Sequence, residues 1–254
     1  MADELVLTLR RQRLIQDAGG HNTWERHTIE RRLPPDRAAI IICDMWDAHW
    51  SRGAAERVAA MVPRMNAVLH AARDRGVRII HAPSETMSFY AGHPARERIL
   101  SVPPVEPPPD LPHEEPPLPV DTSDHGSDTA ASDPTEVPRR VWSRQHPALD
   151  IDAQHDVISD DGRQIYSYLR AQGIEQVLIM GVHTNMCILN RSFAIKQMVR
   201  WGVDIALVRD LTDAMYNPAR PPYVDHWAGV GLVIAYIEKF WCPTVSSEQL
   251  IGHP

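Results

Sequence analysis

Apolar residues gather along the chain in short continuous runs that predict buried strands. The clearest run, AAIIIC at residues 38–43, is followed at once by Asp44. Such an uninterrupted apolar stretch is typical of a parallel strand that is covered on both faces. Similar runs occur at 77–81, 176–181 and 203–210, so we expect further strands of the same kind there.

Between these runs, apolar positions recur at the spacing of an amphipathic helix. Residues 53–75, 161–173 and 187–202 show this spacing, and each segment ends at or just before a glycine, which commonly closes a helix. A last helix is expected at 224–240. Pro63 should kink the first helix or lie in its first turn.

Two shorter segments complete the alternation of strands and helices. RRVWS at 139–143 is expected to form a short strand, and PTVSS at 243–247 an edge strand. Five or six strands that alternate with helices predict an α/β protein with an open, mostly parallel, doubly wound sheet and helices on both faces, in three layers α/β/α. In that architecture, ligands bind beyond the carboxyl ends of the strands.

The segment from about residue 82 to 139 interrupts the regular pattern. It contains a proline-rich stretch, VPPVEPPPDLPHEEPPLPV, and then an acidic one, DTSDHGSDTAASD. A long irregular segment inside a domain is commonly a functional lid or a disordered insertion. We expect an ordered cover over the site, with a solvated surface loop as the alternative. The chain is thus divided into an N-terminal extension, 1–37, and a single domain, 38–254, that contains this insertion.

Charge and hydropathy exclude several classes of partner. The chain has 33 acidic and 26 basic side chains, a formal charge of −7, and no dense run of Lys or Arg, which argues against nucleic acid. No window is apolar over the roughly 20 residues that a membrane span needs. The N-terminus also lacks the apolar core of a secretion signal. We therefore expect a cytoplasmic protein with a small-molecule substrate and no membrane contact.

The cysteines supply one candidate nucleophile. Cys43, Cys187 and Cys242 are too few and too scattered for a disulfide framework, and none lies in a CxxC metal pair. Cys187 ends the stretch GVHTNMC, a few residues past a predicted strand and at the start of a predicted helix. Helix N-terminal N–H groups favour a thiolate there. A buried structural cysteine is the alternative.

Asp44 is the candidate proton acceptor for this thiol. It directly follows a buried strand, so its carboxylate should emerge at the same edge of the sheet as Cys187. A carboxylate can accept the proton of a neighbouring thiol when a nearby cation offsets the paired negative charges. Capping of the following turn is the alternative for Asp44. Trp46 and Trp50 come shortly afterwards and are expected to wall a substrate pocket.

Three stretches carry a resemblance to a known family. IIICDMWDAHW, RVWSRQHPAL and LIMGVHTNMCILNRSFAIKQMVRWGVDIALVRD resemble the isochorismatase-like cysteine hydrolases over residues 38–245. This group includes nicotinamidases, N-carbamoylsarcosine amidohydrolases and ureidoacrylate or biuret hydrolases. The resemblance implies a catalytic triad of Asp, Lys and Cys, with Asp44 and Cys187 as two of its members. It also implies a cis peptide bond between Val182 and His183, and an oxyanion hole formed by the N–H groups of His183 and Cys187.

The lysine of this family is replaced in the present chain. By strand alignment its position falls on Arg144, or on Ser143 if the register shifts by one residue. Arginine keeps the positive charge but not the compact, titratable ammonium group. We expect Arg144 to keep Asp44 ionised. His146 is a second candidate for this task, and we place it with Val182 in the substrate pocket.

The metal ligands of the nicotinamidases are also missing. Their Asp-x-His set after the second strand is replaced by HAPSETMSFYAGH. His81, Glu85 and His93 lie near one another in sequence but lack the tight spacing of a zinc site. We expect no metal and no other cofactor.

These features predict a cysteine-dependent hydrolase that cleaves the C–N bond of a small amide, ureide or carbamoyl compound through a thioester. The alternative is a non-catalytic small-molecule-binding or scaffold protein of the same fold with an impaired triad, which the loss of the lysine favours. Hydrolysis of a vinyl ether, as in family members without the cysteine, is disfavoured by Cys187. We expect the protein to form a homo-oligomer.

Overall fold

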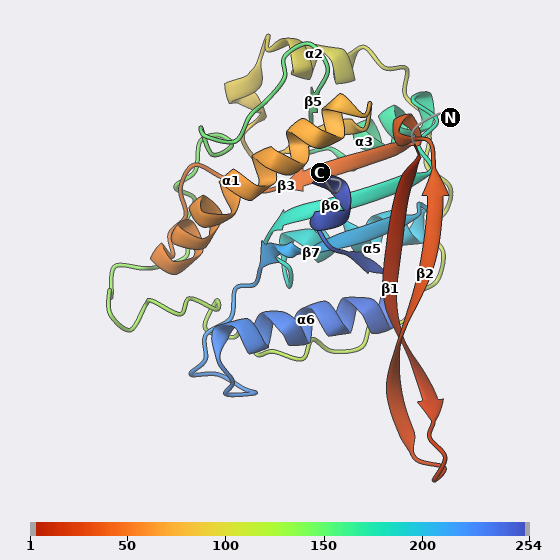
Figure 1. The fold of residues 1–254 in the computed structure, drawn as a ribbon. Coiled ribbons are helices and arrows are strands. Elements are labelled where there is room, and N and C mark those ends of the chain that lie inside the picture. The colour runs from red at the N-terminus through yellow and green to blue at the C-terminus, as the bar shows by residue number, and fades with distance from the viewer. Residues whose placement is uncertain (1–3, 252–254) are drawn as a thin grey trace.

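The computed structural model describes residues 4–251, and an eight-stranded sheet runs through it (Figure 1). The strands are β1 (Leu5–Gln16), β2 (Asn22–Leu33), β3 (Ala38–Cys43), β4 (Arg78–Ala82), β5 (Val157–Ile158), β6 (Gln176–Val182), β7 (Ile205–Asp213) and β8 (Thr244–Val245). Their order across the sheet is β2-β1-β8-β7-β6-β3-β4-β5. Neighbours from β8 to β5 are parallel, whereas β1 is antiparallel to both β2 and β8. The expected open, mostly parallel α/β sheet is confirmed, although it has eight strands instead of five or six.

Helices cover both faces of the sheet and complete the three layers. They are α1 (Arg52–Asp74), α2 (Pro94–Leu100), α3 (Gly162–Ala171), α4 (Cys187–Asn190), α5 (Ile195–Arg200), α6 (His226–Phe240) and α7 (Glu248–Ile251), with short 3₁₀ helices at Pro35–Arg37 and Met87–Tyr90. α1 and α7 pack on one face, and α3, α5 and α6 on the other. β3 shows the result, because Ile40 joins the core beneath α1 whereas Ile41 joins the core on the opposite face. The continuous apolar run of β3 is thus buried on both sides.

Parallel pairing brings three strand ends to one edge of the sheet. Cys43, the last residue of β3, is in register with Ala82 of β4 and with Gly181 of β6. Gly181 has a φ of 116°, and a Cβ there would lie 2.1 Å from the carbonyl oxygen of Cys43. Only glycine therefore allows β3 and β6 to approach so closely at this point. Asp44 and the loop that leads to Cys187 leave the sheet directly from these ends.

One expected strand is not present. Residues 139–143 form no strand, and the only pairing nearby is an isolated bridge between Trp46 and Gln145. Side chains satisfy this backbone instead: the N–H of Ser143 donates to Asp47, and the N–H of Gln145 donates to the Tyr90 hydroxyl. The last strand at this side of the sheet is β5, which lies further along the chain.

Two further expectations need correction. The helix expected at 187–202 is split into α4 and α5, because Arg191 leaves the helix in an extended conformation with φ −62° and ψ 153°. The chain next to Arg191 then packs closely on the start of α3, where a Cβ on Gly162 would lie 2.0 Å from the Ser192 carbonyl oxygen. PTVSS does contribute a strand, β8, but this strand lies between β1 and β7 and not at an edge.

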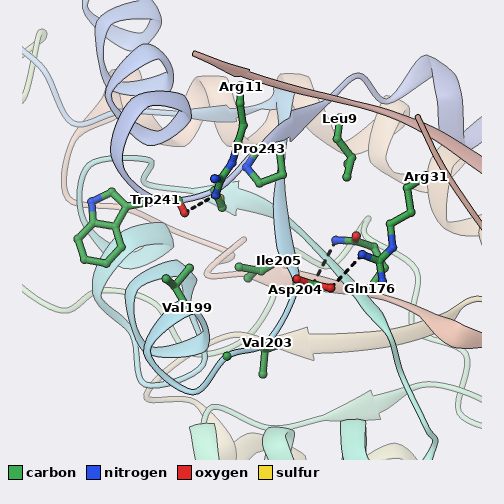
Figure 2. A pocket seen from close by; sticks show the side chains of 12 residues that line it. Leu9, Arg11, Arg31, Gln176, Val199, Val203, Asp204, Ile205, Trp241 and Pro243 are labelled. Atoms are coloured by element: carbon green, nitrogen blue, oxygen red, sulfur yellow. Dashed lines mark hydrogen bonds and ion pairs between the residues drawn. The ribbon is translucent and has the colours of Figure 1, made fainter. Parts of the chain in front are cut away.

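The N-terminal extension forms a long hairpin, β1 and β2, that adds two strands to the sheet and projects beyond it (Figure 1). Two arginines of the hairpin bind to the rest of the domain. Arg11 donates to the Trp241 carbonyl, and Arg31 forms an ion pair of 2.9 Å with Asp204 (Figure 2). These four residues are among those that line a cavity of about 220 Å³ at the amino ends of β6 and β7. That cavity lies at the edge of the sheet opposite Asp44.

The proline-rich part of the insertion runs along α5 and α6. The N–H of Leu111 donates to Arg200 at the end of α5, His113 stacks on Trp241 at 3.9 Å, and the Tyr236 hydroxyl of α6 donates to Pro116. The acidic part of the insertion returns to the carboxyl edge of the sheet, where Ser127 and Thr129 bond to Ser51 and Gly53 at the start of α1, and Asp128 forms an ion pair with Arg57. Within residues 4–251, none of the helices has the length and apolar character to cross a bilayer.

Candidate active site

Asp44 lies fully buried at the end of β3, with a positive φ of 49°. Its two carboxylate oxygens have separate partners. One accepts from the N–H of Ser84 at 2.7 Å, and the other accepts from Nε of Arg191 at 2.9 Å. Burial raises the pKa of the Asp44 carboxyl, and the Arg191 charge and the Ser84 hydrogen bond offset only part of that rise. Asp44 is thus a stronger base than an exposed aspartate.

Cys187 is the first residue of α4, and its thiol lies beside the Asp44 carboxylate. Burial raises the pKa of the Cys187 thiol well above its usual range, and the neighbouring Asp44 charge raises it further. The expectation of a thiolate favoured by a helix N-terminus is therefore wrong. α4 has only four residues, and its weak dipole is outweighed by burial and by the carboxylate. The pair holds a neutral thiol beside a carboxylate that can receive its proton.

The loop before Cys187 is held by side-chain hydrogen bonds to the end of β7. Thr184 donates through its N–H and its hydroxyl to the carbonyl of Asp213. The amide of Asn185 pairs with both the N–H and the carbonyl of Met215, at 3.0 and 2.8 Å. Both side chains are buried, so these bonds fix the direction in which the loop delivers Cys187.

The cation at this site is Arg191, not Arg144. Arg191 contacts Asp44 directly, and its other end lies 3.4 Å from Glu85. The structure does not bring Arg144 to Asp44: its Nε lies 3.9 Å from Asp47, its guanidinium stacks over the Phe89 ring, and its side chain is 42% exposed. The reason is the missing strand at 139–143, which would have aimed this segment along the sheet. Ser143 is also turned away, because its hydroxyl donates to Asp47.

The sequence does contain a signal for Arg191. In CILNR, the arginine follows the cysteine by four residues, which is one helical turn and places both side chains on the same side. The Arg191 N–H accordingly donates to the Cys187 carbonyl. The negative charge of Asp44 raises the pKa of Arg191 further above its usual range against the effect of burial, so this guanidinium stays charged.

The peptide bond between Val182 and His183 is cis. The His183 N–H lies near the Cys187 sulfur and lowers the pKa of that thiol. The N–H of Cys187 has no hydrogen-bond acceptor within residues 4–251. Two backbone donors therefore lie beside the sulfur. Burial lowers the pKa of the His183 ring to about 3, so this imidazole is neutral and adds no charge there.

A cavity of about 210 Å³ is lined by Trp46, His49, His146 and Val182, among others, but not by Asp44, Cys187 or Arg191. Three of the four residues predicted for a substrate pocket are thus brought together. Trp50 is not in the lining and packs against His49 instead. Burial lowers the pKa of the His49 imidazole to about 4, so it is neutral.

Trp46 separates the cavity from the charged groups. Its ring stacks on Trp142 at 4.1 Å, its Nε1 donates to the Ser84 carbonyl, and the Arg191 guanidinium lies 5.8 Å from the ring centroid. The tryptophan is buried and held on several sides, so it forms a rigid apolar wall. Any group in the cavity would lie against this wall and the imidazoles.

Metal binding finds no support in this geometry. Among the residues that the structure describes, no group of three or more His, Cys, Asp or Glu side chains is arranged to hold an ion. His81, one of the weak candidates, is committed elsewhere: its ring bonds to Gln145 and to Asp156. The prediction of a metal-free and cofactor-free site stays a prediction.

A buried carboxylate, a thiol and a guanidinium at the carboxyl edge of a parallel sheet define the class: an α/β/α enzyme with a candidate cysteine nucleophile. Residues 38–220 match the family model of the isochorismatase domain, so the chain belongs to the isochorismatase family and is a hydrolase of that kind. No curated protein sequence matches the chain.

Several solved structures are similar to this chain, and the first named here supports a shared fold. A cysteine hydrolase from Pseudomonas syringae pv. phaseolicola 1448A superposes with a TM-score of 0.54 at 18% identity, over 86% of this chain and 92% of that one. An isochorismatase family protein from Desulfovibrio vulgaris gives a TM-score of 0.46 at 15% identity, over 83% and 94%. N-carbamoylsarcosine amidase from Thermoplasma acidophilum gives 0.44 at 12% identity, over 83% and 96%.

Proposed function

We propose that the protein hydrolyses the C–N bond of a small amide, ureide or carbamoyl compound, with Cys187 as nucleophile, Asp44 as general base and Arg191 as the fixed cation. The observation that carries this proposal is the chain of contacts from the thiol to the buried carboxylate and from the carboxylate to the guanidinium. Such a chain of nucleophile, base and orienting group is the usual basis of covalent hydrolysis.

The proposed reaction begins with proton transfer from Cys187 to Asp44 as the sulfur attacks the carbonyl carbon. The negative charge that develops on the carbonyl oxygen is stabilised by the N–H groups of His183 and Cys187; one such donor is typically worth about 3 to 4 kcal/mol. Asp44 then returns the proton to the leaving nitrogen, and the C–N bond breaks to give a thioester. Water, deprotonated by Asp44, attacks the thioester and releases the acid and the thiol.

Arg191 has a different task from that of a lysine in the same chemistry. Arginine does not lose its proton in proteins, so Arg191 cannot take part in proton transfer. It offsets the charge of Asp44, which limits how far burial raises the pKa of that carboxyl. Because Arg191 supplies a cation, the loss of the family's lysine no longer favours a non-catalytic binding protein.

The direct test is ammonia or amine release across a panel of primary amides, ureides and carbamoyl amino acids. We expect turnover of at least one small compound of these classes. A panel without any turnover, with folded protein, would contradict the proposal and favour a binding protein.

The pH dependence of kcat/KM should show an acid limb that belongs to Asp44. Activity needs the ionised carboxylate, so the rate should fall about tenfold per pH unit below the Asp44 pKa. Since burial raises that pKa, the midpoint should lie above the value of about 3.9 of an exposed aspartate. Arg191 should add no alkaline limb. A rate that stays constant down to about pH 4 would contradict Asp44 as the base.

Replacement of Asp44 should have opposite effects on thiol ionisation and on hydrolysis. In Asp44→Asn the negative charge beside the sulfur is gone while Arg191 remains, so the pKa of Cys187 should fall. The pH profile of alkylation by iodoacetamide should move to lower pH, whereas hydrolysis should drop by about 10²- to 10⁴-fold. Asp47→Asn, which removes a carboxylate without contact to the thiol, is the control and should move the alkylation profile less. An unmoved profile in Asp44→Asn would show that the two groups do not interact.

A further inference from the structure

The outer edge of β2 is the longest unpaired backbone in the sheet. β2 has 12 residues and is the terminal strand, with β1 as its only neighbour in the strand order. An exposed edge of this length presents unpaired N–H and C=O groups and can pair with another strand. Its side chains are mostly exposed, including Ile29 at 57%.

The alternation of hydrogen-bonded pairs in the hairpin shows which residues of β2 direct their backbone N–H and C=O groups to the outer edge. The N–H of Asp17 donates to the carbonyl of His21 next to the turn, and Gln16 pairs with Asn22. In an antiparallel pair, hydrogen-bonded and non-hydrogen-bonded residue pairs alternate. The odd-numbered residues of β2 therefore bond to β1, and the N–H and C=O of even-numbered residues, Thr28 among them, point away from it.

Along this edge, oppositely charged residues lie at equal distances on either side of Thr28. When two copies of β2 pair antiparallel around a two-fold axis at Thr28, residues equally distant from Thr28 face each other. Arg26 of each copy then faces Glu30 of the other, and Glu25 faces Arg31. A two-fold axis at Ile29 would instead place Arg26 opposite Arg32, so like charges oppose that register.

In the single chain, the charged side chains of Arg26 and Glu30 are free to pair with a second copy. Arg26 is exposed and makes no hydrogen bond or ion pair within residues 4–251. Glu30 is 55% exposed and bonds only to Arg32 of its own strand, at 2.7 Å. The hairpin itself is fixed to the body through Arg11 and Arg31 (Figure 2), so its edge is presented in a defined position.

We propose that the outer edge of β2 is an interface for a second copy of this chain, in which two sheets join edge to edge through antiparallel β2 strands centred on Thr28. Main-chain hydrogen bonds supply the affinity, as in other cases of strand addition. The two Arg26–Glu30 pairs set the register. This assembly is independent of the proposed hydrolase activity.

Sedimentation velocity over a concentration series tests the interface with three variants. Thr28→Pro removes an outward N–H without loss of a bond to β1, so it should give a monomer with an unchanged circular dichroism spectrum. Arg26→Glu should raise the dimer dissociation constant by about tenfold or more. The swap Arg26→Glu with Glu30→Arg restores opposite charges and should restore dimerisation.

Three results would overturn the proposal. A wild-type protein that stays monomeric at about 100 µM would show that the charges only protect the edge from pairing. A dimer that Thr28→Pro leaves unchanged would place the interface elsewhere. A charge swap that fails to restore a dimer weakened by Arg26→Glu would exclude the register centred on Thr28.

Discussion

Replacement of Cys187 by alanine should reduce amide hydrolysis by more than about 10⁴-fold and leave the protein folded, because the proposed reaction has no other nucleophile. The side chain is small and only partly buried, so little packing is lost. The measurement is steady-state ammonia release with the best amide of the panel, together with thermal unfolding.

Cys43→Ala is the matched control. Cys43 is fully buried one residue before Asp44, and burial raises its pKa so that it stays a thiol. Its replacement should cost stability, because a cavity forms between β3 and its neighbours, but it should leave most of the activity. Turnover at the wild-type rate in Cys187→Ala would refute Cys187 as the nucleophile. So would a loss of turnover in Cys43→Ala alone, provided that this variant is folded.

Replacement of Arg191 by alanine should lower kcat/KM by about 10²- to 10³-fold. Without this cation, burial raises the pKa of Asp44 further, so the acid limb of the pH profile should move upward in Arg191→Ala. The thiol should also ionise less readily, since the same charge lowers the pKa of Cys187. Arg191→Lys keeps a positive charge and should retain more activity than Arg191→Ala.

Arg144→Ala provides the comparison that separates the two arginines. Arg144 lies over Phe89 beside Asp47, so its removal should cost much less activity than removal of Arg191 and should leave the acid limb in place. The reverse order of effects would return the role of the cation to Arg144 and would mean that the segment around it adopts another position during turnover.

The buried part of the fold is predictable because its signals are local. Continuous apolar runs such as residues 38–43 need cover on both faces, and this requirement fixes a parallel sheet with helices on either side. The hairpin was harder to predict. Leu7 and Leu9 alternate with Thr8 and Arg10, but so short an alternation before a charged segment is a weak signal. Its attachment to the sheet depends on distant partners such as Asp204.

The positions of Asp44 and Cys187 follow from the same logic of strand ends, whereas the position of the cation does not. Whether Arg144 or Arg191 reaches Asp44 depends on side-chain bonds that hold residues 139–145 out of the sheet, among them the hydrogen bond to Tyr90. The ionisation of the thiol was also mispredicted, because burial is a property of the whole fold and cannot be inferred from a helix start.

Intact-protein mass spectrometry of samples quenched in acid during turnover of the best amide would detect a covalent thioester on Cys187. We predict an added mass equal to the acyl group without its amine, located on the peptide that contains Cys187 and absent from Cys187→Ala. Sustained turnover with no adduct at any quench time, or with the adduct on another residue, would contradict a thioester on Cys187.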